Sequence, residues 1–570
     1  MTSIEKEIAN SLEKVIGQHL KSEQIIQLLE VPPQSELGDF AFPCFQLAPM
    51  LKKGPKEIAE FLSKEISLPK IIERAQATGP YLNFFVKKDW IAGQALSRVL
   101  KEKDSFGASK MGKKSKVMVE YSAPNTNKPL HVGHLRNDSI GMSISLLLEA
   151  TGHKVTKTNL VNDRGIHISK SMLAYQKWGK NKKPNKKSDH FVGDFYVLFN
   201  KHAKEDQSLN AEAQFMLKKW ENKDKDTLAL WKKMNKWAFD GFKETYKNFG
   251  SKFDVWLKES DFFDKARPLI QQGLESGLFF EDDNGAIVAK LEHHNLPNKV
   301  VQRSDGTSIY ITNDLALTKH KFEKFKLDKA IWVVGSEQNL YFQQLFQIFE
   351  QLGFKWAKQC KHRTYGMVYL PEGKMKSREG TVVDADDLMD EVKVLAEKEI
   401  KKRYSKLSKA EREKRAKAIS LAAIKFFMLR IDEIKDLYFD PKESISFEGE
   451  TGPYVQYTYA RAKSILRKAG KLGRKSDLSL LQSDSEKQIV TILYNFPETV
   501  EKAASSLKPH KICHFLIELA SAFNSFYHST PVIKAETPEL TRARLALVEA
   551  TAQVLKNGLK LLNIQPIEKM

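Results

Sequence analysis

The sequence has little cysteine: its 570 residues include three, Cys44, Cys360 and Cys513, far apart and without a CxxC pair. This spacing excludes a disulfide framework and a cysteine-based zinc cluster, and it fits a reducing compartment. A run of about 18 apolar residues, as needed to cross a membrane, is also lacking. The first residues form an amphipathic, partly acidic pattern instead of the apolar core of a signal peptide. We therefore expect a soluble cytoplasmic protein with no membrane partner.

Acidic residues are in the minority. The chain has 92 lysine and arginine residues against 71 aspartate and glutamate residues, a formal net charge of +21. Its 41% hydrophobic and 10% aromatic content excludes a disordered tail protein. A folded basic protein is a candidate partner of nucleic acid, although a lysine-rich surface alone would give the same charge. The length exceeds one hydrophobic core and predicts about two to four domains.

The most informative stretch runs from 117 to 141, where an apolar strand leads through a turn rich in proline and asparagine into a helix. Val117–Val119 is typical of a strand buried on both faces, and Ile140, Ile144 and Leu147 recur at helical spacing. The N-terminus of such a helix presents unpaired N–H groups and a partial positive charge, which suit a polyphosphate. The stretch is therefore a candidate phosphate site without a Walker loop.

Two histidines and a glycine begin this helix. His131 and His134 lie three residues apart and share a face, so both rings can reach one ligand. Gly133 has no side chain, so a base or a phosphate could approach the backbone closely. For an HxxH pair alone, the alternative is a capped helix whose histidines merely lie at its end. The complete pattern PNxxxPxHxGHxR is far more specific.

Changes in pattern divide the chain into three parts. Residues 1–110 are typical of an α+β domain that ends in a charged linker. Strand and helix patterns alternate over 111–440 and predict a parallel sheet, interrupted by an aromatic-rich helical insertion at about 190–280. A basic tract at 177–187 is expected to be an exposed loop, and the sequence leaves open whether it contacts RNA. Helical periodicity dominates 441–570 and predicts an all-α bundle.

Several motifs resemble those of class I aminoacyl-tRNA synthetases. His131-Val132-Gly133-His134 resembles their HIGH signature, and the segment Lys374–Arg378 (KMKSR) resembles their KMSKS loop. Further pieces are similar to arginyl-tRNA synthetases in particular, in the expected order: Ser122–Asn125, Phe253-Asp254 with Glu259-Ser260, Ser304–Tyr310 with Asp314, and Gly452–Tyr457 with Ala460-Arg461. The match covers nearly the whole chain, which is identified as a member of that family.

The resemblance implies a doubly wound, Rossmann-like α/β core that forms arginyl-adenylate from L-arginine and ATP and then arginylates tRNA(Arg). Mg²⁺ is expected to arrive with ATP, without a dedicated site on the protein. His131 and His134 would bind the triphosphate and ribose as catalytic groups, and Gly133 would make room for adenine. The other residues that the resemblance assigns to catalysis or ATP binding are Lys374, Met375, Lys376, Ser377 and Arg378.

The second motif departs from the family pattern, because lysine is third and serine fourth where the reverse order is usual. Which lysine reaches the phosphates, Lys374 or Lys376, is therefore open. Lys128, three residues before His131, is a candidate substitute cation with a catalytic role.

By motif position, the resemblance assigns arginine binding to Glu120, Asn125, Tyr310, Asp314 and Gln338. A planar guanidinium is best held by bidentate hydrogen bonds to carboxylates, which makes Glu120 and Asp314 the expected pair. Asn125 and Gln338 are expected at the α-amino and carboxylate end of the substrate. Asp314 taken alone has another explanation, as the N-cap residue of a helix.

The helical C-terminal part resembles the family's anticodon-binding bundle, and the N-terminal part resembles its added tRNA-contacting domain. Tyr457 and Arg461 are the expected tRNA contacts in the bundle, by stacking and phosphate binding. Asn83, polar within an apolar aromatic strand, is the candidate for base readout, with an asparagine at a turn or sheet edge as the alternative. We expect a monomer.

Two other functions fit part of the pattern. A cysteinyl-type class I synthetase shares the HIGH and KMSKS elements, but the sequence lacks a zinc-ligand cluster and carries the arginyl-like GPYxQYxxAR string. A tRNA-binding relative without catalysis is favoured only by the altered lysine motif, since the histidines and the glycine are intact.

Overall fold

The computed structural model describes residues 4–570 apart from 18, 33, 264, 307–308, 371–382 and 471–475. The chain separates into two compact units. None of the helices within these described ranges is long and apolar enough to span a membrane. The first unit comprises Met1–Lys103, Ala469–Tyr494 and Ser525–Thr551, and the second comprises Asp104–Lys468, Asn495–Asn524 and Ala552–Met570.

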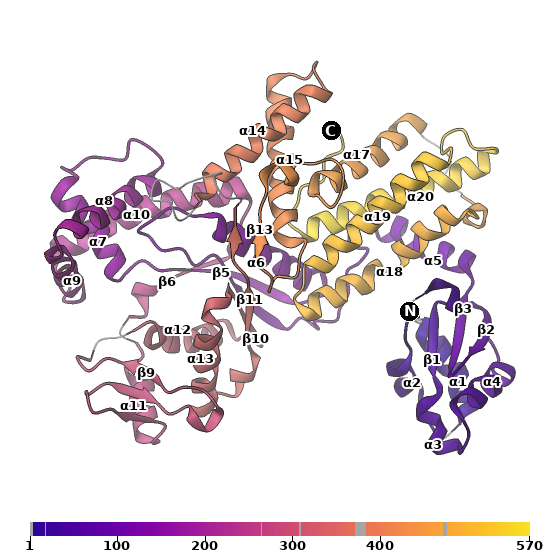
Figure 1. Cartoon of the computed structure of the whole chain (residues 1–570), viewed down its shortest axis with the longest axis horizontal. Coiled ribbons are helices and arrows are strands. Elements are labelled where there is room, and N and C mark those ends of the chain that lie inside the picture. The colour runs from indigo at the N-terminus through magenta and orange to yellow at the C-terminus, as the bar shows by residue number, and fades with distance from the viewer. Residues whose placement is uncertain are drawn as a thin grey trace. The chain divides into compact units, whose positions relative to one another are not determined.

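The N-terminal part of the first unit is a small α+β fold (Figure 1). Its antiparallel sheet has the order β1-β3-β2, and the predicted strand near residue 80 is the central strand β3. Helix α1 buries Ile4, Ile8 and Leu12, which recur at helical spacing and so form one apolar face. The elements are β1 (Phe40–Pro43), β2 (Ile72–Thr78), β3 (Tyr81–Val86), α1 (Ile4–Ile16), α2 (Ser22–Leu28), α3 (Ala48–Leu51), α4 (Pro55–Glu65) and α5 (Lys88–Glu102).

A five-stranded parallel sheet forms the centre of the second unit. Its order is β11-β10-β4-β5-β6, so the chain first builds outward from β4 on one side and later returns to the other. The direction of winding therefore changes between β4 and β10, which is where open α/β sheets bind ligands. This confirms the predicted doubly wound core. The strands are β4 (Lys116–Glu120), β5 (Lys154–Val161), β6 (Val255–Lys258), β10 (Lys329–Gly335) and β11 (Cys360–Tyr365).

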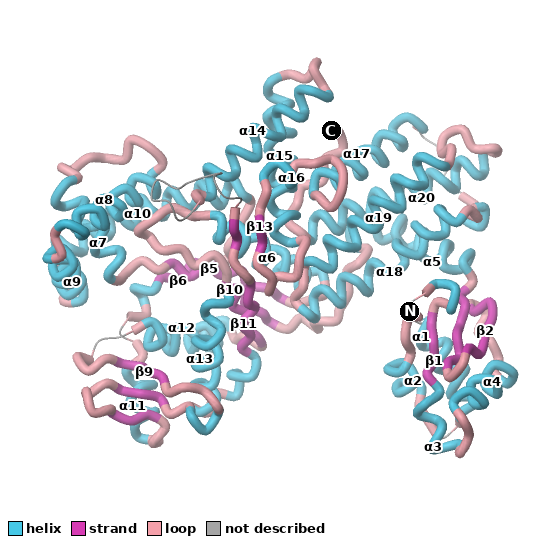
Figure 2. The backbone as a smooth tube through the Cα atoms, in the orientation of Figure 1, coloured by secondary structure: helices cyan, strands magenta, loops and turns pink. Residues whose placement is uncertain are grey.

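Helices and a second sheet interrupt or flank this core (Figure 2). Three helices, α8–α10, make up most of the insertion expected at about 190–280, but β6 within that range belongs to the main sheet. The antiparallel sheet β7-β8-β9 follows. The elements are α6 (Val132–Ala150), α7 (Ile166–Trp178), α8 (Ser188–Glu205), α9 (Ser208–Glu221), α10 (Lys225–Phe249), α11 (Arg267–Glu275), β7 (Phe279–Glu281), β8 (Ile287–Ala289), β9 (Lys299–Gln302), α12 (Tyr310–Phe325) and α13 (Asn339–Gln351).

The described residues of the rest of the chain are almost entirely helical, as its periodicity predicts. Among them, one short parallel strand pair, β12 with β13, is the exception. Parts of the last four helices belong to each of the two units. The elements are β12 (Val368–Tyr369), α14 (Ala385–Arg403), α15 (Lys409–Leu429), β13 (Leu437–Tyr438), α16 (Pro441–Ser444), α17 (Gly452–Ala469), α18 (Asp484–Ser506), α19 (His510–Ser529) and α20 (Pro538–Leu561).

Candidate active site

The loop after β4 has an unusual backbone conformation. Ser122 and Ala123 have positive φ angles of 75° and 49°, a region that residues other than glycine rarely occupy. Two asparagine side chains stabilise it. Asn137 Oδ1 accepts the N–H of Ser122 at 2.6 Å, and Asn159 Oδ1 accepts the N–H of Ala123 at 3.2 Å. The loop is therefore fixed at the switch point of the sheet.

The two predicted histidines begin α6 at the end of this loop. His131 is the N-cap residue, and its Nδ1 accepts the N–H of Gly133 at 3.2 Å. His134 Nδ1 accepts the N–H of His131 at 3.1 Å, and the ring centroids lie 4.0 Å apart. Because both Nδ1 atoms accept hydrogen bonds, each neutral ring carries its proton on Nε2. A β carbon at Gly133 would lie 3.0 Å from the His131 ring, so glycine keeps the helix start open.

Burial, together with the nearby charge of Lys128, lowers the pKa of His131 to about 4. Burial also holds the pKa of His134 well below its usual value, and His131 and Lys128 add to the effect. Near neutral pH the pair therefore offers two uncharged N–H donors beside the helix N-terminus. The structure thus brings Lys128, His131, Gly133 and His134 together, as expected from the sequence. The segment Lys374–Arg378, with Met375, Lys376 and Ser377, lies outside the described residues.

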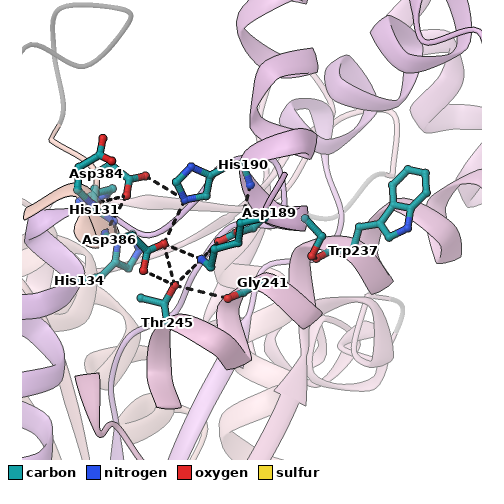
Figure 3. A network of polar contacts seen from close by, with 12 residues as sticks. His131, His134, Asp189, His190, Trp237, Gly241, Thr245, Asp384 and Asp386 are labelled. Atoms are coloured by element: carbon teal, nitrogen blue, oxygen red, sulfur yellow. Dashed lines mark hydrogen bonds and ion pairs between the residues drawn. The ribbon is translucent and has the colours of Figure 1, made fainter. Parts of the chain in front are cut away.

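Backbone hydrogen bonds connect residues 130–132, where the HIGH-like signature begins, to a distant segment of the chain. Hydrogen bonds of 2.9 and 3.0 Å join residues 130–132 to residues 383–385, around a β-bridge between His131 and Asp384. On the other side of Asp384 lies His190 of α8, 3.6 Å away from Nε2 to Oδ2 (Figure 3). The helical insertion, through His190 of α8, therefore contacts the segment 383–385, which in turn pairs with residues 130–132.

Asp189, His190 and Asp386 lie close enough together to hold a metal ion (Figure 3). Lys187 already pairs with both carboxylates. Lys187 Nζ lies 2.7 Å from Asp386 Oδ2 and 2.9 Å from Asp189 Oδ2, and it donates to Thr245 Oγ1 at 2.6 Å. The hydrogen bond to Asp386 raises the pKa of His190. The expectation of an exposed basic tract is wrong for Lys187, because these acceptors draw its side chain inward.

Two carboxylates predicted to bind arginine lie beside a buried lysine. Glu120 ends β4, and its Oε2 lies 2.6 Å from Lys321 Nζ of α12. Asp314, earlier on α12, accepts a hydrogen bond from the hydroxyl of Tyr341. Burial raises the pKa of Asp314 to about 6, the hydrogen bond from Tyr341 and the charge of Lys321 oppose the rise, and Glu120 adds to it. Glu120 and Asp314 are therefore electrostatic neighbours, as the sequence predicts.

Helix α12 begins at Tyr310, so Asp314 lies in its second turn. The N-cap explanation for Asp314 is therefore wrong. Tyr310 is 64% exposed at the helix start. Asn125 forms a backbone bridge with Asn162, next to the end of β5. Gln338 is exposed just after β10, on the other side of the switch point from β5.

Two residues of this region were not assigned from the sequence. Glu259 is buried, with one oxygen lacking a hydrogen-bond donor among the described residues and Asn313 Nδ2 donating to the other at 3.0 Å. Burial raises the pKa of Glu259 to about 7, and Asp314 adds to the rise while Arg164 opposes it. Lys321 is the second residue. Lys321 follows Asp314 by seven residues, or two helical turns, and this spacing could have placed both side chains on the same face of one helix.

The three predicted tRNA contacts have different surroundings. Asn83 is 4% exposed in the central strand β3, so the explanation by a turn or sheet edge is wrong. Arg461 donates to Tyr457 Oη at 3.2 Å and to Asn524 Oδ1 at 2.6 Å, with its guanidinium 4.8 Å from the Tyr457 ring centroid. The structure thus brings Tyr457 and Arg461 together on α17. Their contacts with tRNA stay predictions.

Comparison with known proteins agrees with this geometry. Residues 95–441 match the family model for the catalytic domain of class I tRNA synthetases (R), which defines the chain as a class I aminoacyl-tRNA synthetase. Residues 455–570 match the DALR anticodon binding domain, and residues 2–86 match the arginyl tRNA synthetase N-terminal domain. The chain belongs to the arginyl-tRNA synthetase family.

Individual relatives match along the whole chain. The arginine–tRNA ligase of Treponema denticola is 43% identical, with 95% of this chain and 94% of the relative covered. That of Borrelia turicatae is 41% identical, with both chains fully covered. Among solved structures, Thermus thermophilus arginyl-tRNA synthetase has a TM-score of 0.83 at 27% identity and covers 99% of both chains.

Proposed function

We propose that this chain ligates L-arginine to tRNA(Arg) in two steps, through an arginyl-adenylate formed with ATP. One observation carries the proposal. Strand β4 ends at Glu120, beside the half-buried Asp314, and eleven residues later the same connection starts the helix that carries His131 and His134. A carboxylate site for a cationic side chain and a phosphate site therefore adjoin at one switch point.

The first step requires positioning and charge stabilisation rather than covalent catalysis. The carboxylate of arginine attacks the α-phosphorus of ATP, and pyrophosphate leaves. Neutral His131 and His134 donate from Nε2 to phosphate oxygens without a positive charge that would have to be desolvated. Lys128 supplies the nearby positive charge. We propose that Mg²⁺ arrives bound to ATP, because both carboxylates of the Asp189–His190–Asp386 cluster are already paired with Lys187, so the cluster does not fit the ion.

Arginine would lie on the acidic side of the switch point. Asp314 is oriented by Tyr341 and faces no side-chain cation within ion-pair distance among the described residues, so a guanidinium would supply the missing charge. Glu120 would contribute its second oxygen. We add Glu259 to this site because its unpartnered oxygen is buried near Asp314. Asn125, Tyr310 and Gln338 complete the proposed set.

In the second step, we propose that arginine is transferred from the adenylate to tRNA(Arg). Tyr457 and Arg461 are proposed to contact tRNA(Arg), and Asn83 to read a base. A monomeric, cytoplasmic enzyme is the corresponding expectation.

Replacing Asp314 with alanine tests the arginine site. Removing one partner of a buried ion pair costs about 3–5 kcal/mol, so the KM for arginine should rise about 100-fold or more. The KM for ATP should change less than about threefold, because the phosphate side of the site is untouched. Steady-state aminoacylation with saturating tRNA(Arg) measures both constants. Equal increases in the two KM values would refute the assignment.

A further inference from the structure

Lys321 is a buried charge that the proposed reaction does not use. Its side chain is 1% exposed. Because a lysine is almost never fully buried without a partner, its contacts call for an explanation. Its ammonium lies 2.6 Å from Glu120 Oε2 and 5.2 Å from the ring centroid of Trp332, which pairs with Glu120 across β4 and β10. One oxygen of Glu120 therefore contacts the ammonium of Lys321, and this ammonium also lies near the ring of Trp332.

The charges around the arginine site are unevenly compensated. Glu120, Asp314 and Lys321 together carry one net negative charge, and Glu259 adds part of another, so the site has negative charge left to bind one guanidinium. Asp314 accepts a hydrogen bond from the neutral hydroxyl of Tyr341, and Glu259 accepts one from the neutral amide of Asn313. Neither carboxylate has a lysine or arginine within ion-pair distance among the described residues. Arg164, the cation that acts on Glu259 from farther away, is paired with Glu221 at 2.7 Å. Lys321 is therefore the cation that sets the charge next to Glu120.

We propose that Lys321 is a positioning residue for arginine selection. Its ammonium fixes Oε2 of Glu120, so that Glu120 presents one oriented oxygen to the substrate instead of a carboxylate that can rotate. It also occupies the place on Glu120 that the compact ammonium of a lysine substrate would take. A planar guanidinium, which donates along fixed directions, is selected over a point charge. This inference rests on the proposed arginine site.

The test compares two lysines of α12. Lys321→Met keeps the length of the side chain and removes its charge. Lys319→Met is the matched control, because Lys319 is a partly exposed residue of the same helix, paired with Glu323 at 2.6 Å. Both variants lose one charge, but only the first leaves Glu120 without compensation. Thermal unfolding should show both variants folded; if Lys321→Met is not, Lys321→Gln, which removes the charge and keeps a polar group at this position, replaces it.

We expect Lys321→Met to raise the KM for arginine about tenfold or more, with less than about a twofold change for ATP, because a buried charge partner is lost on the arginine side only. The ratio of kcat/KM for arginine to that for lysine should fall by a similar factor. Lys319→Met should change none of these values by more than about twofold. Lys321→Arg, which retains a positive charge, should recover part of the loss.

A double-variant cycle shows whether Lys321 acts through Glu120. The KM for arginine in Glu120→Gln/Lys321→Met should be no higher than in the worse single variant, since the two groups act as one unit. Independent, multiplying effects would overturn the proposal, and so would an unchanged KM for arginine in Lys321→Met. If Asp314→Ala raises this KM and Lys321→Met does not, the inference alone fails. If neither variant changes it, the proposed arginine site fails.

Discussion

Replacing Arg136 with methionine should remove the hydrogen bonds that connect α6 to the strand pair β12–β13, and so destabilise the protein. Arg136 lies on α6, two residues after His134, and its side chain is fully buried. Its guanidinium donates four hydrogen bonds to backbone carbonyls of other segments, and burial lowers its pKa. The acceptors and distances are Gly366 (2.7 Å), Met367 (3.0 Å), Glu433 (3.1 Å) and Lys435 (2.7 Å).

These carbonyls lie just before β12 and β13, so one side chain fixes the starts of both strands to α6. Each carbonyl left without a donor costs about 1 kcal/mol or more, which gives about 4 kcal/mol for the four. Relief of the desolvation of a buried guanidinium offsets part of this loss, but losing four hydrogen bonds from a charged group is still expected to cost about 3–5 kcal/mol. For a unit of this size, the transition temperature should fall by about 3–6 °C.

Differential scanning calorimetry measures this change. Arg403→Met is the control, because Arg403 is exposed at the end of α14 and its contact is with the Phe447 ring, 4.6 Å away, worth about 1 kcal/mol at most. The kcat of adenylate formation should fall with Arg136→Met, since β12 leads toward the KMSKS-like segment. An Arg136→Met transition within about 1 °C of the control would refute the argument.

Two further predictions concern pH and packing. Since Asp314 has a pKa of about 6 and binds a cation as the carboxylate, kcat/KM for arginine should fall as the pH drops through about 6. Asp314→Asn should remove this fall and leave only the contribution of Glu259, whose pKa is about 7; a profile unchanged by Asp314→Asn would contradict this. Gly141→Ala would place a β carbon 2.2 Å from Cγ of the buried Tyr121, so α6 should shift, at a cost of about 1–3 kcal/mol measured by thermal unfolding. Gly93→Ala, with no atom within 4 Å of the new carbon, should show no loss.

Much of the fold follows from local pattern. The apolar run at 117–119 and the helical spacing after residue 132 predict β4 and α6, because burial on both faces and amphipathicity leave distinct periods in the sequence. The predicted meeting of His131 with His134 depends only on helical spacing. The connection through 190–280 is less predictable: β6 has four residues, and a strand that short leaves little periodic signal inside a helical insertion.

The side chains that complete the site depend on contacts between distant segments. Lys321 and Lys187 lie in lysine-rich stretches, where each resembles a solvent-exposed charge. Burial reveals them, because Lys321 reaches Glu120 across about 200 positions and Lys187 reaches Asp386 across a similar span. The left-handed conformation of Ser122 and Ala123 was also not predictable, since neither residue favours it and the asparagines that stabilise it come from other elements.

ATP–pyrophosphate exchange tests the central claim most directly. With the purified chain, Mg²⁺-ATP and tRNA(Arg), exchange should appear when L-arginine is added and should be at background with lysine or cysteine. Omission of tRNA(Arg) should reduce it strongly, as the family resemblance implies. His134→Ala should reduce exchange about 100-fold or more by removing a phosphate donor that depends on the folded site. Exchange that is absent with arginine, or that another amino acid supports equally well, would contradict the account.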